Sequence, residues 1–187
     1  RASSGYYTKA DGTLQSFGSN TLRYGTNGLL VEEERTNILL HSNNPGSGTG
    51  AWGSSGGGGF PPIAQDAVGP DGVTNSAWTV TLPGSGIYNQ IGGNWSGVGV
   101  VSIWLRAKSG TLNGFLNPTG DDNTGRKAIT LTTTWQRFTS VEGTDMTGKS
   151  RFCFVLIAGN PTFELFGSQA EVGAFATSYI PTTTGSA

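Results

Sequence analysis

The sequence predicts an all-β fold, either a sandwich or a barrel. Its 187 residues include 31 Gly and many Thr, Ser and Asn, a mixture that disfavours helices and supplies tight turns. The 9 Phe, 5 Trp and 5 Tyr favour strands instead. Short apolar runs recur at even spacing, with turn signals between them and no helical stretch. The length suits one domain with a core, with or without an appendage.

Residues 1–35 differ in character from the rest of the chain. Turn signals at Asp11-Gly12 and around Asn27-Gly28 predict two short hairpins, the first with a type I′ turn. Because this stretch contains little apolar mass, we expect it to pack on the main domain or on a neighbouring subunit. The charged run at 32–35 favours a solvated corner. The alternative is an ion pair between Arg35 and one Glu at a subunit contact.

The main domain is expected to begin with a strand at 36–40, followed by a long loop over 43–63. Four consecutive glycines in this loop are followed by neither Lys-Ser/Thr nor a helix, which excludes a P-loop. Trp52 in the same loop either packs on the sheet edge or stacks on a ligand. Nine further strands are predicted at 63–68, 75–82, 86–92, 98–107, 111–117, 126–132, 135–141, 150–157 and 162–171.

Alternation within these strands assigns their faces. In the strand at 98–107 one face carries the aliphatic residues Val101, Ile103, Leu105 and Ala107, which we expect in the core. The other face carries Ser102, Trp104 and Arg106. In the strand at 86–92, Tyr88 and Gln90 lie opposite Ile87 and Ile91, so they are expected to line the same concavity as Trp104.

The end of the chain, residues 166–187, predicts an edge strand that leaves the sheet at Gly173 and then runs extended. Pro181 fixes φ and removes a backbone donor, so the chain there follows a surface rather than entering a sheet.

Charge and composition exclude several classes of protein. The 11 Lys+Arg against 12 Asp+Glu give a net charge of −1, so we expect no nucleic-acid partner and no polybasic membrane patch. No apolar run is long enough to span a bilayer, so membrane insertion is not expected. Cys153 is the only cysteine and stands in an apolar run, which predicts a buried, inert thiol. The missing initiator Met leads us to expect further sequence before Arg1.

Four separated segments carry a resemblance to a known family. They are GLLVEEERTNILL at 28–40, VSIWLRAK at 101–108, TWQR at 134–137 and FGSQAEVGAFATSYIPTTTGSA at 166–187. In this order they resemble bacteriophage tail-fibre and head-fibre virion proteins that contain a carbohydrate-binding-module-like jelly roll. The resemblance implies a collar at 1–35, a β-sandwich jelly roll at 36–172 and an extended tail at 173–187. It also implies a virion-surface, extracellular location, contacts with other virion subunits and a homo-oligomer, with a trimer favoured.

Sugar binding requires flat aromatic faces for stacking and planar polar groups that bridge hydroxyls. Trp104, Arg106, Tyr88 and Gln90 supply both kinds of group, and the candidate ligand-binding set is completed by Trp52 and Trp95 on nearby loops. The alternative is that Trp104 covers the sheet beneath the amino-terminal segment and that Arg106 pairs with a Glu. Aromatic residues on strands ordinarily serve packing, and we assign Trp78 and Trp135 to core or edge positions.

Catalytic residues are not expected. The acidic residues lie mainly in turns, and Glu164 and Glu171 would face opposite sides of a regular strand, whereas glycoside hydrolysis needs two carboxylates on one face. His41 is the only histidine, which leaves no Ser-His-Asp arrangement and no His-rich metal site.

No cofactor is expected apart from a structural calcium ion, which jelly rolls of the resembling kind often hold between their first and last strands. Here its oxygen donors would be Asn43, Asn44 and Glu171. The chain has no dense Asp cluster, and Asp121-Asp122-Asn123 is typical of a plain turn.

The sequence therefore favours a lectin-like, non-catalytic virion module that binds host polysaccharide and serves host recognition. The alternative is a purely structural decoration or connector protein that binds no glycan. Exposure of the Trp104 face distinguishes the two, because a face covered by the collar or by a neighbour cannot stack on a sugar.

Overall fold

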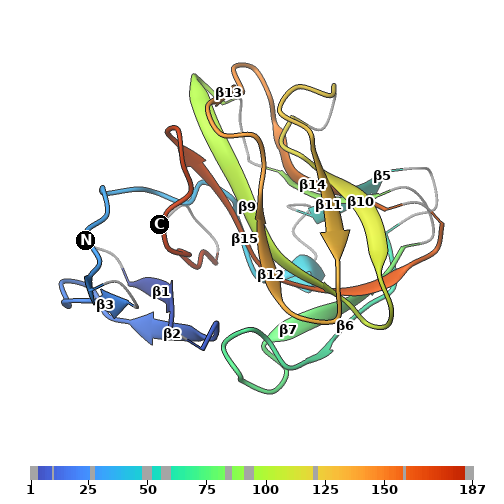
Figure 1. The fold of residues 1–187 in the computed structure, drawn as a ribbon. Coiled ribbons are helices and arrows are strands. Elements are labelled where there is room, and N and C mark those ends of the chain that lie inside the picture. Colours follow the sequence, from blue (N-terminus) through green and yellow to red (C-terminus); the bar gives the residue numbers. More distant parts are fainter. Residues whose placement is uncertain are drawn as a thin grey trace.

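Two antiparallel sheets pack face to face in the computed structural model of the chain (Figure 1). The structure describes residues 4–9, 11–25, 28–47, 52–55, 60–82, 86–90, 95–119, 122–157 and 159–183. Its elements in chain order are β1 (Gly5–Thr8), β2 (Leu14–Phe17), β3 (Tyr24–Gly25), β4 (Gly28–Leu29), η1 (Pro45–Ser47), β5 (Trp52–Ser55), β6 (Ile63–Ala67), β7 (Ala77–Thr81), β8 (Gly86–Gln90), β9 (Val98–Ala107), β10 (Leu112–Asn117), β11 (Lys127–Leu131), β12 (Gln136–Thr139), β13 (Thr144–Asp145), β14 (Arg151–Ile157) and β15 (Thr162–Val172).

The strand orders define a β-sandwich jelly roll and confirm the predicted fold class. One sheet has the order β11-β10-β14-β8-β5, and the other has the order β12-β9-β15-β7-β6, with β13 paired to β9. We call them the five-stranded and six-stranded sheets. Within the described residues, no helix is long and apolar enough to cross a membrane.

The core lies between the two sheets, where the alternation of β9 predicted it. Its inward residues Val101, Ile103, Leu105 and Ala107 are at most 1% exposed. They meet Leu116, Leu131, Ile157, Ile87, Val80 and Phe163 from the other strands. Burial of these side chains is the main favourable term in the free energy of folding.

The nine strands predicted beyond residue 62 all form, with ends that shift by a few residues. Two expectations in the preceding region are wrong. Residues 52–55, expected in a loop, form β5 at the edge of the five-stranded sheet. Residues 36–40, expected as a strand, form none. Here the Asn37 side chain replaces ladder hydrogen bonds to β15, because it donates to the Ser168 carbonyl and accepts from the Ala170 N–H.

The last strand, β15, was expected at an edge and is instead central along its first half. Residues 162–165 pair with β7 on one side, and β9 pairs along the other side. A bulge between Phe166 and Gln169 interrupts the β9 ladder, with Gly167 at φ 59°. Beyond it the strand pairs with β9 alone. The chain leaves the sheet at Gly173, as predicted, where φ is 129°.

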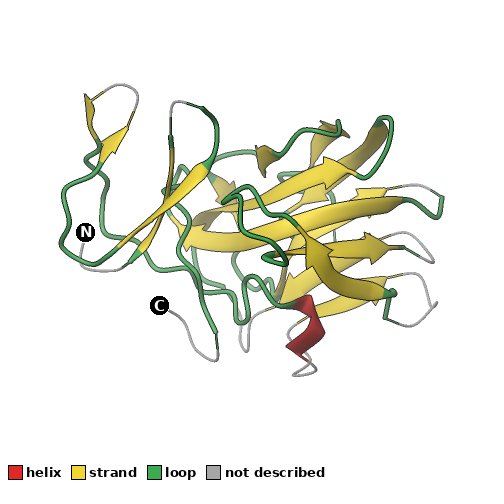
Figure 2. Ribbon diagram, turned by 90° about the horizontal axis from the view of Figure 1, so that it is seen from below, coloured by secondary structure: helices red, strands yellow, loops and turns green. Residues whose placement is uncertain are grey.

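Both amino-terminal hairpins are present, formed by β1–β2 and β3–β4. The first has a five-residue connection rather than the predicted two-residue type I′ turn, closed by a hydrogen bond from the Gly12 N–H to the Lys9 carbonyl. Figure 2 shows these strands beside the sandwich rather than within it. Hairpin β1–β2 is joined to the carboxyl-terminal segment by a bridge between Tyr6 and Tyr179.

Candidate functional site

Trp104 lies on the outer face of the six-stranded sheet, as the alternation predicts, but this face is covered. Only 5% of its surface is exposed, and it packs in a second apolar cluster with Leu14, Phe166 and Tyr179. Leu14 comes from hairpin β1–β2 and Tyr179 from the carboxyl-terminal segment. The prediction that Trp104 offers an open face for stacking is therefore wrong. The alternative holds, in which Trp104 covers the sheet beneath the amino-terminal segment.

Arg106, two residues along β9, is also held by the protein. Its guanidinium forms an ion pair with Glu164 on β15, directly across the ladder, and lies 4.7 Å from the centroid of the Trp135 ring. A further hydrogen bond of 3.3 Å goes to the Val68 carbonyl. Arg106 thus matches the predicted pairing with a Glu and is not turned toward an open surface beside Trp104.

Trp52 and Trp95 are core residues in this structure, 6% and 3% exposed. Of the two roles considered for Trp52, packing on the sheet and stacking on a ligand, the structure shows packing. Strand β5 pairs with β8 and turns the indole into the sandwich. Its Nε1–H donates a 2.9 Å hydrogen bond to the His41 carbonyl. Neither residue presents a ring face to solvent.

Tyr88 and Gln90 lie on β8, in the other sheet from Trp104. Ile87 and Asn89, the neighbours of Tyr88 on either side, are fully buried, so Tyr88 faces outward from the five-stranded sheet. The predicted common concavity with Trp104 is therefore wrong, because the two residues lie on opposite outer faces of the sandwich. The backbone of Gln90 pairs with Arg151, while its side chain falls outside the described part of the chain, as does that of Cys153.

The half-buried Tyr88 ring lies flat against its neighbouring strand. A Cβ added at Gly53 on β5 would come within 2.5 Å of the Tyr88 Cζ and Oη atoms, so the ring occupies the space that the glycine leaves. The Arg151 guanidinium lies 5.2 Å from the ring centroid. Gly53 and Arg151 thus both lie against the ring and restrict its position.

Further planar and polar groups lie on the same outer face. Phe115 on β10 is 38% exposed, and the Arg126 guanidinium lies 3.6 Å from its ring centroid. Asn113 accepts a 2.9 Å hydrogen bond from the Thr130 hydroxyl on β11. We name this surface the Tyr88 face; it consists of Tyr88, Asn113, Phe115, Arg126, Thr130 and Arg151. Sequence reasoning missed all but Tyr88, although the alternation around Leu116 places Phe115 and Asn113 outward.

The residues predicted to bind calcium are not brought together. The Asn43 side chain accepts from the Gly167 N–H and donates to the Ser76 carbonyl, both at 2.9 Å, whereas Asn44 is exposed. The Glu171 carboxylate accepts hydrogen bonds from the Thr177 N–H and hydroxyl at the far end of β15. Oxygens already used in this way form no common donor set for a cation.

Glu164 and Glu171 share the outer face, contrary to the prediction for a regular strand, because the bulge at 166–169 shifts the alternation. Glu164 is opposite Arg106 and Glu171 is opposite Val100. Each carboxylate is nevertheless engaged, Glu164 by Arg106 and Glu171 by Thr177. Among the described residues, no three His, Cys, Asp or Glu side chains gather as a metal site would require.

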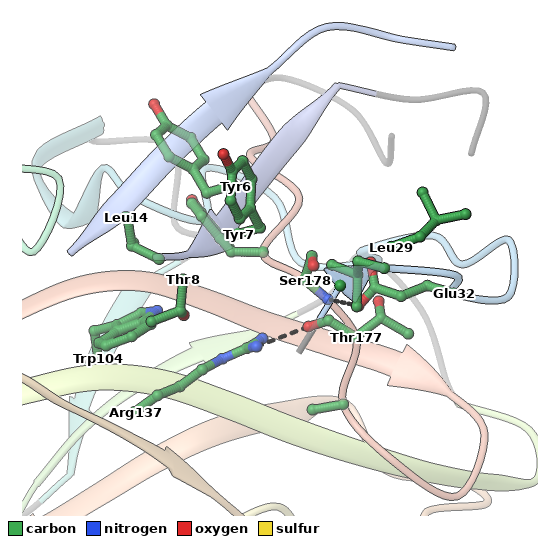
Figure 3. Close-up of a pocket in the computed structure, with 14 residues that line it drawn as sticks. Tyr6, Tyr7, Thr8, Leu14, Leu29, Glu32, Trp104, Arg137, Thr177 and Ser178 are labelled. Carbon is green, nitrogen blue, oxygen red and sulfur yellow. Dashed lines mark hydrogen bonds between the residues drawn. The ribbon is translucent and has the colours of Figure 1, made fainter. Parts of the chain in front are cut away.

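A pocket of about 300 Å³ lies where the terminal segments meet the six-stranded sheet (Figure 3). We name it the clamp pocket. It is lined by Tyr6, Tyr7, Thr8, Leu14, Gly28, Leu29, Leu30, Glu32, Trp104, Arg137, Ala176, Thr177, Ser178 and Tyr179. Glu32, expected at a solvated corner, is 13% exposed and forms a 2.6 Å ion pair with the buried Arg23. Burial acts to raise the pKa of Glu32, but hydrogen bonds from Ser178 and the ion pair with Arg23 outweigh it and lower that pKa.

For Arg35 the sequence left two alternatives, a solvated corner and an ion pair with one Glu, and the structure has features of both. Its guanidinium forms a 2.6 Å ion pair with Glu33, and it also donates to the Val172 carbonyl and lies 5.1 Å from the Phe175 ring centroid. These contacts are made within one chain and fix the point at which the carboxyl-terminal segment leaves β15.

Neither a family model nor a curated protein matches the sequence. Among solved structures, the fold is similar to the CBM22-1 xylan-binding domain from Paenibacillus barcinonensis Xyn10C, with 14% identity and a TM-score of 0.48 over 78% of this chain and 100% of that chain. TmCBM61 in complex with β-1,4-galactotriose matches with 12% identity and a TM-score of 0.45 over 72% of this chain and 97% of that chain.

The enzymatically active domain of bacteriophage CBA120 tailspike protein 4 matches 74% of this chain with 11% identity and a TM-score of 0.46. This chain covers 21% of the tailspike chain. At such identities and TM-scores, these similarities do not assign a function.

Proposed function

We propose that the chain is a non-catalytic module that binds polysaccharide at the surface of a phage virion. The observation that carries the proposal is the difference between the two outer faces of the sandwich. The six-stranded sheet is covered by hairpin β1–β2 and the carboxyl-terminal segment, whereas the Tyr88 face bears exposed residues on β10, β11 and β14.

The chemistry of the Tyr88 face suits a hydroxyl-rich chain. The Tyr88 ring is packed against Gly53, so it can stack on the C–H bonds of a sugar ring without first being ordered. Hydrogen-bond donors and acceptors on the same face come from Arg151, Asn113 and Thr130. A single face of this kind binds weakly, and a homo-oligomer, with a trimer favoured, would raise the avidity through an intramolecular second contact.

The virion assignment rests on the four sequence segments that resemble phage fibre proteins. Parts of three of them meet at one place in the fold, since Arg137 contacts Thr177 and Glu32 contacts Ser178. These motifs therefore maintain the architecture of the terminal segments, which supports an assignment to that class of protein and directs the search for a ligand to the other face.

A binding assay on the whole chain tests the glycan proposal. We expect binding to a glycan array and to host-surface polysaccharide, and a loss of at least tenfold in affinity for Tyr88→Ala. Tyr24→Ala is the matched control, because Tyr24 is 64% exposed on β3, away from the Tyr88 face. Equal binding by both variants would overturn the assignment of the face.

A structural connector is the second candidate, and the covered Trp104 face is the observation that favours it. In that case the wild-type chain would bind no polysaccharide even when displayed in many copies, and its contacts would be with other virion subunits.

A further inference from the structure

The clamp pocket is distinct from the Tyr88 face and lies on the opposite side of the sandwich. Its volume of about 300 Å³ is at the lower end of the range of about 300–1,000 Å³ for small-molecule sites. Three separate parts of the chain build it: hairpin β1–β2, residues 28–32 and residues 176–179. Trp104 and Arg137 of the six-stranded sheet also line it (Figure 3).

The Trp104 indole leaves a polar group without a partner at this pocket. The Nε1 atom is buried, and it makes no hydrogen bond within the described structure. A buried donor that gives up water without gaining an acceptor is destabilising, and such groups in native proteins call for a physical explanation. Trp104 lines the pocket and its Nε1 atom is covered in the free protein, so an acceptor oxygen of a bound molecule reaches this donor once the covering side chains move aside.

Two charged side chains of opposite sign line the pocket, and both are positioned by hydrogen bonds to the protein. The Arg137 guanidinium donates to the Thr177 carbonyl at 2.7 Å and to the Ser102 hydroxyl at 2.8 Å. The Glu32 carboxylate accepts from the Ser178 N–H at 2.7 Å. Among the described residues that line the pocket, no other side chain is charged. Glu32 is already paired with Arg23, so a phosphate would meet a carboxylate and a single guanidinium, a setting that suits a neutral polar molecule better.

The remaining lining is largely aromatic and aliphatic. Tyr6 and Leu14 lie beside Trp104, and Tyr6 is fixed by a stacked contact with Tyr179 at a centroid separation of 5.7 Å. A ligand that combines a C–H surface with several hydroxyl groups matches this mixture of apolar walls and fixed polar atoms.

We infer that the clamp pocket binds one neutral, hydroxyl-rich ring, a single sugar unit or the end of a glycan, through an acceptor oxygen facing the Trp104 Nε1–H. The ligand class is shared with the proposed function, but the site is separate and does not depend on the Tyr88 face. A ligand here touches both terminal segments and the sheet at once, so binding stabilises their docking by mass action.

The test follows the Trp104 indole N–H directly in a two-dimensional ¹H–¹⁵N spectrum of the full chain. The chain has 5 Trp and therefore five indole signals, and the signal that disappears in Trp104→Phe is that of Trp104. The probes are free D-glucose, D-galactose and N-acetyl-D-glucosamine at millimolar concentrations. We expect at least one of them to shift the Trp104 signal to saturation.

Three variants locate the effect. Ala176→Phe places a ring in the pocket without altering Trp104, and we expect at least a fivefold loss of sugar affinity. Trp104→Phe removes the donor while keeping an aromatic ring, and we expect a similar loss, measured by calorimetry. Tyr88→Ala is expected to leave the shift of the Trp104 signal unchanged.

A Trp104 signal that no sugar moves would overturn the inference and would leave ordered water as the partner of the indole. A shift that vanishes in Tyr88→Ala would also overturn it, because the effect would then come from the other face. Loss of polysaccharide binding in Tyr88→Ala with the Trp104 shift retained keeps the two proposals apart. If circular dichroism shows that Ala176→Phe does not fold, the sugar affinity of Trp104→Phe alone tests the inference.

Discussion

At the scale of single residues, buried polar side chains determine how the carboxyl-terminal segment is attached. Asn37, fully buried, donates to the carbonyls of Ser168 and Ile180 at 3.1 and 2.8 Å. Its Oδ1 accepts from the N–H groups of Leu39 and Ala170. One amide thus joins three segments that are distant in the sequence, and all of its hydrogen-bonding capacity is used within the protein.

Asn37→Ala is expected to lower the free energy of unfolding by about 3 kcal/mol or more, because it leaves buried N–H and carbonyl groups without partners. The midpoint of urea unfolding measures the change. Asn113→Ala is the control, since Asn113 is exposed and makes one hydrogen bond to Thr130; it should cost under about 0.5 kcal/mol. Similar costs for the two variants would contradict the role assigned to Asn37.

Tyr179 gives a prediction for alkaline pH. Burial raises the pKa of its hydroxyl, which contacts the Ser42 hydroxyl at 2.8 Å, above the ordinary value of 10.0. Above pH 10 the unfolded chain loses this proton while the folded chain keeps it. The stability is therefore fully present below pH 10 and falls as the pH rises, by up to about 1.4 kcal/mol per pH unit.

In Tyr179→Phe this loss is absent, so its unfolding free energy should fall less steeply above pH 10 than that of the wild type. Chemical denaturation at a series of alkaline pH values measures both slopes. Parallel slopes would show that Tyr179 ionises equally easily in the folded state.

At the scale of elements, the bulge in β15 accommodates the carboxyl-terminal segment. Gly167 has φ 59°, a left-handed conformation that favours glycine, and a Cβ there would lie 3.0–3.2 Å from the Tyr179 ring. The bulge also moves Glu171 to the outer face, where it accepts hydrogen bonds from Thr177. A local irregularity thus determines where residues 177–179 dock.

Gly167→Ala is expected to destabilise the protein by about 1–3 kcal/mol more than Gly110→Ala. Gly110 has a similar φ of 62° but open space around the position of a Cβ, so it isolates the cost of backbone strain. That strain alone is about 1–2 kcal/mol. Thermal unfolding of the two variants gives the difference, and equal destabilisation would show that the Tyr179 ring yields without cost.

At the scale of the whole molecule, contacts between distant parts of the sequence dominate. Strand β9 pairs with β15, so Ala107 meets Phe163, and Ser42 hydrogen-bonds with Thr182. Each such contact closes a long loop before it contributes stability, which slows folding.

We therefore expect refolding on the order of milliseconds to seconds, as is common for sandwiches rich in non-local pairing. Stopped-flow tryptophan fluorescence after dilution from urea measures the rate. Relaxation in microseconds would contradict this expectation and would indicate that local contacts dominate the transition state.

Several features were determined by the sequence itself. Nine of the strands beyond residue 62, all but the short β13, and the aliphatic core face of β9 were predicted correctly, because alternation with a period of two and turn residues are local signals. The same signals placed Trp104 and Arg106 on the outer face of their sheet and marked Gly173 as the point where the chain turns away.

Only the tertiary structure decided which outward-facing residues are open to solvent. Trp104 is covered because Leu14 and Tyr179 pack on it from the two ends of the chain, and Tyr88 is on the opposite side because β8 belongs to the other sheet. The 166–169 bulge and the buried pair of Glu32 with Arg23 likewise depend on distant partners. Alternation specifies the direction of a side chain, whereas its exposure is determined by segments far away in the sequence that pack against it.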